Sequence, residues 1–185
     1  MADSFGLCID LDRCWGCRTC EVACALEKGT GPGTGLIRVE EILSVPGNAQ
    51  PGSPQGKSHV PVLCQHCERA ECVAQCSQGA LYRDQGGFVV FDGSLCIACG
   101  ICESACPYGA IQLSSDGGTP RKCDQCRSRV ESGRLPACAQ HCPGKAIALI
   151  GPRGALTAEV KGLYSVGNVV YIARSSRRSH GQAEQ

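Results

Sequence analysis

The sequence predicts a small α+β fold of short strands, hairpins and short helices, held together by cysteine-bound groups as much as by an apolar core. Three observations predict it. Cysteine occurs 17 times in 185 residues, a frequency typical of cross-linked or metal-bearing chains. Hydrophobic residues make up 43% of the chain, but only about a third of the chain is apolar once the cysteines are subtracted. The apolar runs are strand-length, and 24 Gly and 10 Pro residues interrupt them.

Composition excludes several classes of protein. No apolar run approaches the roughly 18 to 20 residues of a membrane-spanning helix, so we expect no transmembrane segment. Residues 1–14 contain no apolar segment typical of an export signal. We therefore expect reduced thiols rather than a disulfide framework, and a cytoplasmic location. The formal net charge of +1 provides no basic field for nucleic acid.

Sixteen of the cysteines fall into four quartets, each of which begins with a two-residue spacer and ends with a three-residue spacer. The quartets are Cys14, Cys17, Cys20 and Cys24; Cys64, Cys67, Cys72 and Cys76; Cys96, Cys99, Cys102 and Cys106; and Cys123, Cys126, Cys138 and Cys142. Only the middle spacer varies, so the quartets form an internal repeat.

The third quartet, which is followed by Pro107, matches the bacterial signature for [4Fe–4S] clusters. In this motif three thiolates surround one cluster, while the fourth lies on the next helical turn and reaches a neighbouring cluster. Quartets must then come in pairs, and four quartets predict four [4Fe–4S] clusters. Spacing alone leaves open whether the pairs are nested or follow one another in order.

Zinc is the remote alternative, because zinc also binds paired cysteines. The third cysteine of the first and third quartets would be superfluous in such a site. Cys8 has no partner at ligand spacing, and it alternates with Leu7 and Ile9 as on a strand, so we expect a structural or spare thiol.

The expected elements follow the quartets along the chain. Residues 5–12 and 36–45 predict strands, because apolar and β-branched residues alternate with polar ones. The segment HVPVL leads into the second quartet. Glycine pairs at 86–87 and 117–118 predict two hairpins.

The fourth quartet encloses a predicted short helix over 127–134, which ends at Gly133. A strand over 146–151 follows, and NVVYIA at 168–173 predicts one more.

The four quartets, with the sequences CWGCRTCEVAC, CQHCERAECVAQC, CIACGICESACPYGAI and KCDQCRSRVESGRLPACAQHCPGKAI, resemble the four-cluster iron–sulfur subunits of the dimethyl-sulfoxide-reductase and polysulfide-reductase kind. The resemblance covers residues 5–151. It implies two ferredoxin-like lobes with two [4Fe–4S] clusters each, one lobe nested in the other. Ser77 departs from the proline that the family usually has after the second quartet, which puts the stiffness of that turn in doubt.

The resemblance also implies how the cysteines group into four ligand sets, here named after their first member. The Cys14 set is Cys14, Cys17, Cys20 and Cys142; the Cys24 set is Cys24, Cys123, Cys126 and Cys138; the Cys64 set is Cys64, Cys67, Cys72 and Cys106; and the Cys76 set is Cys76, Cys96, Cys99 and Cys102.

The nested arrangement divides the chain into five parts. They are an outer lobe at 1–45 and 120–155, an inner lobe at 59–119, a loop at 46–58, a C-terminal extension at 156–174, and a disordered tail at 175–185. His66 and His141 adjoin ligand cysteines, where hydrogen bonds that tune a cluster are conceivable and a ligand role is disfavoured.

No catalytic constellation is visible in the sequence, so an enzyme activity of the chain itself is uncertain. The resemblance implies an electron-transfer subunit between a large molybdenum- or tungsten-pterin catalytic subunit and a second redox partner: a membrane quinone-handling subunit, a flavin subunit or a ferredoxin. A free-standing polyferredoxin is the main alternative. The expected location is the cytoplasm, at the membrane face, with a periplasmic site by co-export as the alternative.

Overall fold

A computed structural model describes residues 5–31, 33–43, 57–115, 117–151, 163–165 and 167–173. The first elements in chain order are β1 (Gly6–Asp10), α1 (Thr19–Lys28), β2 (Ile37–Leu43), β3 (Lys57–Leu63), α2 (Glu71–Ala74), β4 (Leu81–Arg83), β5 (Val89–Phe91) and α3 (Ile101–Ser104). They are followed by β6 (Ile111–Leu113), β7 (Pro120–Lys122), α4 (Arg127–Glu131), α5 (Ala137–Gln140), β8 (Ile147–Ile150), β9 (Leu163–Ser165) and β10 (Val169–Ile172).

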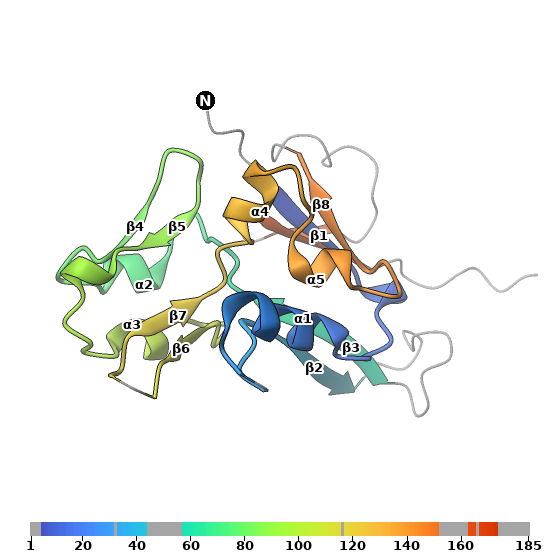
Figure 1. Cartoon of the computed structure of the whole chain (residues 1–185), viewed down its shortest axis with the longest axis horizontal. Coiled ribbons are helices and arrows are strands. Elements are labelled where there is room, and N and C mark those ends of the chain that lie inside the picture. The colour runs from blue at the N-terminus through green and yellow to red at the C-terminus, as the bar shows by residue number, and fades with distance from the viewer. Residues whose placement is uncertain are drawn as a thin grey trace, which may run out of the picture.

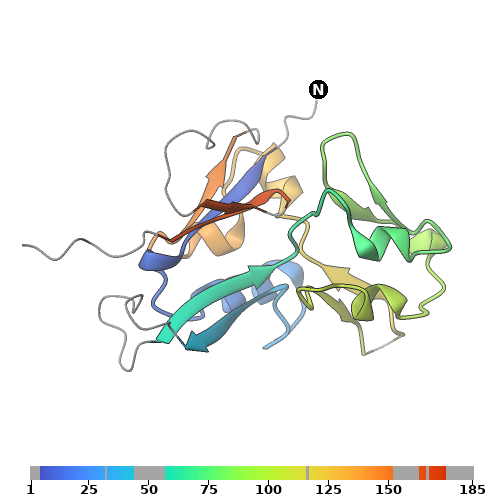
Figure 2. The same cartoon turned by 180° about the vertical axis from the view of Figure 1, so that it is seen from behind.

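The described strands form four small sheets, and the first and last parts of the chain share one of them. Its strand order is β8-β1-β10-β9, with β1 antiparallel to β8 and parallel to β10. The other three sheets are the antiparallel pairs β2–β3, β4–β5 and β6–β7. Figure 2 shows β10, in red, alongside β1, in blue.

The molecule has two halves that the chain visits in the order outer, inner, outer. In Figure 1 the hairpins β4–β5 and β6–β7, with α2 and α3, lie on one side, opposite the sheet around β1 and the helices α1, α4 and α5. The β2–β3 pair lies beside α1, on the side of the outer segments. The assignment of these halves as ferredoxin-like lobes stays a prediction.

The predicted strands and hairpins occur where the sequence places them. The two glycine pairs lie in the turns of β4–β5 and β6–β7, and β2 falls within 36–45. The helix expected over 127–134 is α4, and it ends at Glu131, with Gly133 in the turn that follows. Residues 46–56, most of the expected loop, and the expected tail lie outside the described residues.

One boundary of the predicted loop is wrong. Residues 57 and 58 belong to β3, because Lys57 pairs with Leu43 and Ser58 pairs with Ile42. The long partner strand extends the ladder into this polar segment, which composition alone assigns to a loop. The expected start of the inner lobe at residue 59 consequently falls inside β3.

The core mixes apolar side chains with cysteine sulfurs. The larger cluster packs Leu7, Ile9, Ile37, Leu63 and Val169 against cysteines of the first, second and fourth quartets. A smaller cluster packs Leu81, Val89 and Ile111 against Cys72. Over the part of the chain that is described, no helix is both long and apolar enough to cross a bilayer.

Candidate metal centres

Each quartet begins with a loop that contains at least one residue with left-handed backbone geometry. The residue before the second cysteine has a positive φ in all four loops, at Gly16 (78°), His66 (48°), Ala98 (55°) and Gln125 (54°). This conformation turns backbone N–H groups toward the first cysteine: Ala98 donates to Cys96 Sγ at 3.3 Å and Gln125 donates to Cys123 Sγ at 3.3 Å. Such a concave row of N–H groups favours an anionic sulfur.

The ends of the second, third and fourth quartets supply a second kind of N–H donor. Their last cysteines follow the short helices α2, α3 and α5, and the chain then turns so that a later N–H faces the sulfur. Ala110 donates to Cys106 Sγ at 3.4 Å, and Ala146 donates to Cys142 Sγ at 3.3 Å. Hydrogen bonds to the sulfurs are one of the protein's means of tuning an iron–sulfur cluster.

All four cysteines of the Cys14 set line one pocket. Three of them come from the first quartet, and Cys142 comes from the turn after α5. Burial raises the pKa of the Cys20 thiol to about 12, and the neighbouring charge of Cys14 acts in the same direction. Trp15 also lines this pocket and remains 60% exposed, and a Cβ atom at Gly144 would collide with the Arg13 carbonyl oxygen and crowd the Trp15 ring.

The four cysteines of the Cys76 set likewise line one pocket in the inner half. Cys96, Cys99 and Cys102 meet Cys76 there, with Ile97, Ile101 and Leu81 between them. Cys76 differs from most of the other cysteines: burial acts to raise the pKa of this thiol, but four backbone N–H groups from Gln78 to Leu81 outweigh it and lower the pKa. Ser77 therefore leaves this turn able to present its N–H groups.

The cysteines of the other two sets lie deeper. Burial raises the pKa of Cys72 to about 11, and the charges of Cys64, Cys106 and Cys67 add to the effect. Burial likewise raises the pKa of Cys138, and the charges of Cys126, Cys24 and Cys20 add to the effect. Cys20 is a member of the Cys14 set, so these charges show that the cysteines are close to one another and do not separate the sets.

The two deep sets meet where the inner and outer halves touch. Burial raises the pKa of Cys123 in the Cys24 set, and the charge of Cys64 contributes to the rise. Cys64 and Cys123 also pack in one core cluster. Common pockets bring together the cysteines of the Cys14 and Cys76 sets, and the four ligand sets stay a prediction.

The donor chemistry fits iron–sulfur clusters. Ligand cysteines must be thiolates, but burial makes isolated thiolates costly at most of these positions, so they need a cationic core within each set. A [4Fe–4S] core supplies that charge, and the N–H donors meet the sulfurs. Within the described ranges, no three or more Cys, His, Asp or Glu side chains converge as they would around a single metal ion.

Cys8 lies apart from all four sets. It is buried in β1 and packs against Val170, Ile172 and the partly buried Ile150. Burial raises the pKa of its thiol, with a smaller contribution from Asp10. Its surroundings are those of a small apolar residue.

Several buried polar residues around the sets were not identified from the sequence. Arg83 donates hydrogen bonds to the backbone carbonyls of His66 and Cys67. Gln65 donates a hydrogen bond to the Tyr171 hydroxyl at 3.0 Å. Arg129 joins three segments that carry the Cys24 set. Their partners lie far away in the chain, so local sequence patterns contain no signal for them.

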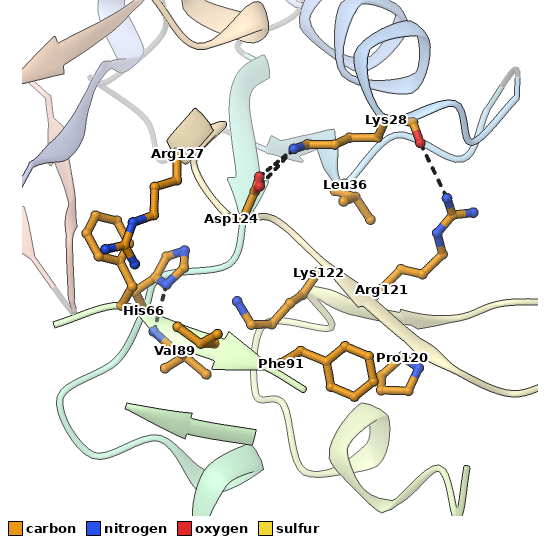
Figure 3. A pocket seen from close by; sticks show the side chains of 12 residues that line it. Lys28, Leu36, His66, Val89, Phe91, Pro120, Arg121, Lys122, Asp124 and Arg127 are labelled. Carbon is orange, nitrogen blue, oxygen red and sulfur yellow. Dashed lines mark hydrogen bonds and ion pairs between the residues drawn. The ribbon is translucent and has the colours of Figure 1, made fainter. Parts of the chain in front are cut away.

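A cleft of about 420 Å³ lies against the deep sets, and Figure 3 shows the side chains that line it. Lys28 forms an ion pair with Asp124 at 2.7 Å, and Arg127 forms one with Asp84 at 2.5 Å. Lys122 donates to the backbone carbonyl of Cys123 at 3.1 Å. The cleft therefore presents cationic groups beside two sets that become anionic when they bind clusters.

Comparison with known proteins identifies the same chemistry. A family model described as a 4Fe-4S dicluster domain matches residues 57–151. The chain is 38% identical over 152 residues to a probable anaerobic dimethyl sulfoxide reductase chain, YnfG, of Escherichia coli strain K12, and the match covers 80% of this chain and 73% of that protein. A second anaerobic dimethyl sulfoxide reductase subunit of the same strain gives the same identity and coverage.

Similarity extends to proteins named for other reductases. The thiosulfate reductase electron transfer subunit PhsB of Salmonella typhi is 38% identical over 139 residues, covering 75% of this chain and 71% of that protein.

Proposed function

Because this chain belongs to the family of iron–sulfur subunits that serve dimethyl sulfoxide reductase and related enzymes, we propose that it carries electrons through four [4Fe–4S] clusters between a catalytic subunit and a second redox partner. The convergence of the Cys14 and Cys76 sets on one pocket each, with sixteen quartet cysteines in the chain, supports the number four. A bound [4Fe–4S] cluster accepts and releases electrons at a potential that its surroundings set.

The chain's own residues hold the sulfurs and control access of water. Backbone N–H groups of the four loops face the sulfurs, and the apolar core surrounds the Cys24 set and part of the Cys64 set. The proposed ligands are the four sets defined above, each with three cysteines of one quartet and one of its nested partner.

We propose that the Cys14 and Cys76 sets are the two ends of the path. Cys17 and Cys99 are the only exposed cysteines among the 17, and each belongs to one of these sets. The deep sets would connect the ends, through neighbouring Cys64 and Cys123. Exposed Trp15 at one end, and Ile97 and Ile101 at the other, would give partners apolar surface near the clusters.

The catalytic partner is proposed from the names of the relatives, which are chains or subunits of reductases. We propose a molybdenum- or tungsten-pterin subunit on one side and a quinone-handling subunit, a flavin subunit or a ferredoxin on the other. The proposed location is the cytoplasm, at the membrane face, and fractionation of cells tests it against the periplasmic alternative.

Anaerobic purification with metal analysis tests the cluster number. We expect a brown protein with about sixteen iron and sixteen sulfide per chain, since each cluster holds four of each. A colourless zinc protein would refute the proposal. A brown protein that never co-purifies with a large catalytic subunit would favour the free polyferredoxin.

The substitution Cys142→Ser tests the nested grouping, with Cys8→Ser as the matched control. Nesting predicts that Cys142→Ser alters the electron paramagnetic resonance signal of the cluster in the Cys14 set. A change confined to the cluster bound by the third quartet would contradict it. Cys8→Ser removes a thiol outside the four sets, so all four signals and the iron content should stay unchanged.

A further inference from the structure

His66 occupies an unusual position in the repeated loop. It has φ 48°, a conformation that costs free energy for a residue with a Cβ atom, and the equivalent positions in the first and third quartets are Gly16 and Ala98. The side chain is fully buried and points into the cleft of Figure 3. A large polar side chain in a strained, buried position is expected to make tertiary contacts that offset the cost of the strain.

One ring nitrogen anchors the first hairpin of the inner half. His66 Nδ1 accepts a hydrogen bond from the Val89 N–H at 3.0 Å. The ring meets Phe88 edge-on at 5.3 Å, and the guanidinium of Arg127 lies over the same Phe88 ring at 5.2 Å. The imidazole thus fixes the start of β5 relative to the loop of the Cys64 set.

The other ring nitrogen lies near the segment that carries Cys123. Because Nδ1 is an acceptor, the neutral ring carries its single proton on Nε2. Nε2 has no hydrogen-bond partner within the described residues. His66 lines the same cleft as Lys122 and Asp124, the two neighbours of Cys123 in the chain (Figure 3), so its buried N–H dipole lies beside the Cys24 set.

We propose that His66 is a positioning residue of the junction between the Cys24 and Cys64 sets: it anchors hairpin β4–β5 through Nδ1 and holds its buried Nε2–H group beside Cys123, which raises the reduction potentials of the two clusters that meet there. The inference rests on the proposed function, since it requires clusters in both sets. The physical basis is that a fixed N–H dipole near an anionic cluster favours the added electron.

The test is a potentiometric titration of the holoprotein, followed by electron paramagnetic resonance, for wild type, His66→Leu, His66→Asn and His141→Leu. His66→Asn offers Oδ1 near the place of Nδ1, and asparagine tolerates a positive φ, so this variant retains the anchor but loses the Nε2–H group. His141 is the matched control, because it also adjoins a ligand cysteine but is exposed.

We expect His66→Asn and His66→Leu to lower the reduction potentials of the clusters in the Cys24 and Cys64 sets. At a fixed applied potential, the ratio of reduced to oxidised cluster should fall about tenfold. That factor corresponds to about 59 mV for a one-electron couple. The clusters of the Cys14 and Cys76 sets should keep their potentials, and His141→Leu should change none. His66→Leu should also lower the thermal stability, because the Val89 N–H loses its acceptor.

Unchanged junction potentials in a folded His66→Asn protein would overturn the proposal, and so would an equal shift of all four clusters. The iron content of the wild type separates the two claims. A wild type with fewer than four clusters contradicts the proposed function, whereas unchanged potentials in a fully loaded variant contradict the role of His66 alone.

Discussion

The substitution Arg129→Met should selectively destabilise the cluster of the Cys24 set. Arg129 Nε donates to the Leu135 carbonyl at 2.9 Å, Nη1 to Glu27 Oε2 at 2.6 Å, and Nη2 to Gln140 Oε1 at 2.5 Å. Glu27 lies on α1 with Cys24, Gln140 lies on α5 with Cys138, and Cys126 precedes α4. One guanidinium therefore joins the three segments that supply this set.

The size of the effect follows from burial. The Arg129 side chain is 9% exposed and Glu27 is 28% exposed. Removal of one partner from a buried ion pair costs about 3 to 5 kcal/mol. We expect about 3 kcal/mol, at the low end, because the Glu27 carboxylate keeps some contact with water after the guanidinium is lost.

The assay is the rate of iron release into excess chelator, monitored by the resonance signal of each cluster. At about 1.4 kcal/mol per factor of ten, 3 kcal/mol raises the population of the locally opened state about a hundredfold. Arg129→Lys should recover only part of the loss, because an ammonium cannot reproduce the planar fork. Lys57→Ala is the control: it removes an exposed ion pair with Glu41, far from the Cys24 set in the chain.

An unchanged rate of iron release from the Cys24 set in the Arg129→Met protein would refute this reasoning. Simultaneous loss of all four clusters would also refute it, because the partners of Arg129, which are Glu27, Leu135 and Gln140, lie outside the segments that carry the Cys76 set.

Two further predictions concern the C-terminal strand. In Gly167→Ala the new Cβ would collide with the Gln65 carbonyl oxygen, so the backbone must shift; we expect about 2 to 3 kcal/mol of destabilisation, measured as accelerated iron loss from the Cys64 set. Tyr171→Phe removes the hydrogen bond from its hydroxyl to the Pro61 carbonyl and the one that it accepts from Gln65, at a cost of about 2 kcal/mol in thermal denaturation. Burial raises the pKa of Tyr171 to about 12, from 10 in the unfolded chain, so its contribution is complete below pH 10 and disappears as the pH rises toward 12. The Tyr171→Phe protein should show a correspondingly smaller fall in stability over that range, and an identical fall would contradict the assigned environment of the hydroxyl.

The sequence was sufficient for the features that depend on local spacing. The quartets define the ligand loops because a short chain segment can bring three sulfurs together only at a few separations. The hairpins β4–β5 and β6–β7 were predictable because their glycine pairs lie between short strands. Both kinds of feature are determined by neighbours within about ten residues.

Features that depend on pairing between segments far apart in the sequence could not be predicted from local spacing. The strand over 168–173 was predictable, but its position beside β1 and parallel to it was not, since alternation specifies a strand and not its neighbour. That pairing brings Asn168 to the loop of the Cys64 set, where its N–H donates to the Gln65 carbonyl at 2.8 Å. The extension therefore supports a ligand loop about a hundred residues earlier in the chain.

A comparison of the four ligand loops with one another nevertheless shows a difference at the left-handed position. The left-handed position holds Gly16 and Ala98 in the loops of the two exposed sets, but His66 and Gln125 in the loops of the two deep sets. Only glycine adopts this conformation at low cost, so His66 and Gln125 differ from Ala98 in their side chains and not in the backbone cost. Gln125 is also buried, and neither of its amide atoms has a hydrogen-bond partner among the described residues. Because an unpaired buried amide costs about 1 to 3 kcal/mol, a group that pairs with it only when the clusters are in place would account for glutamine at this position.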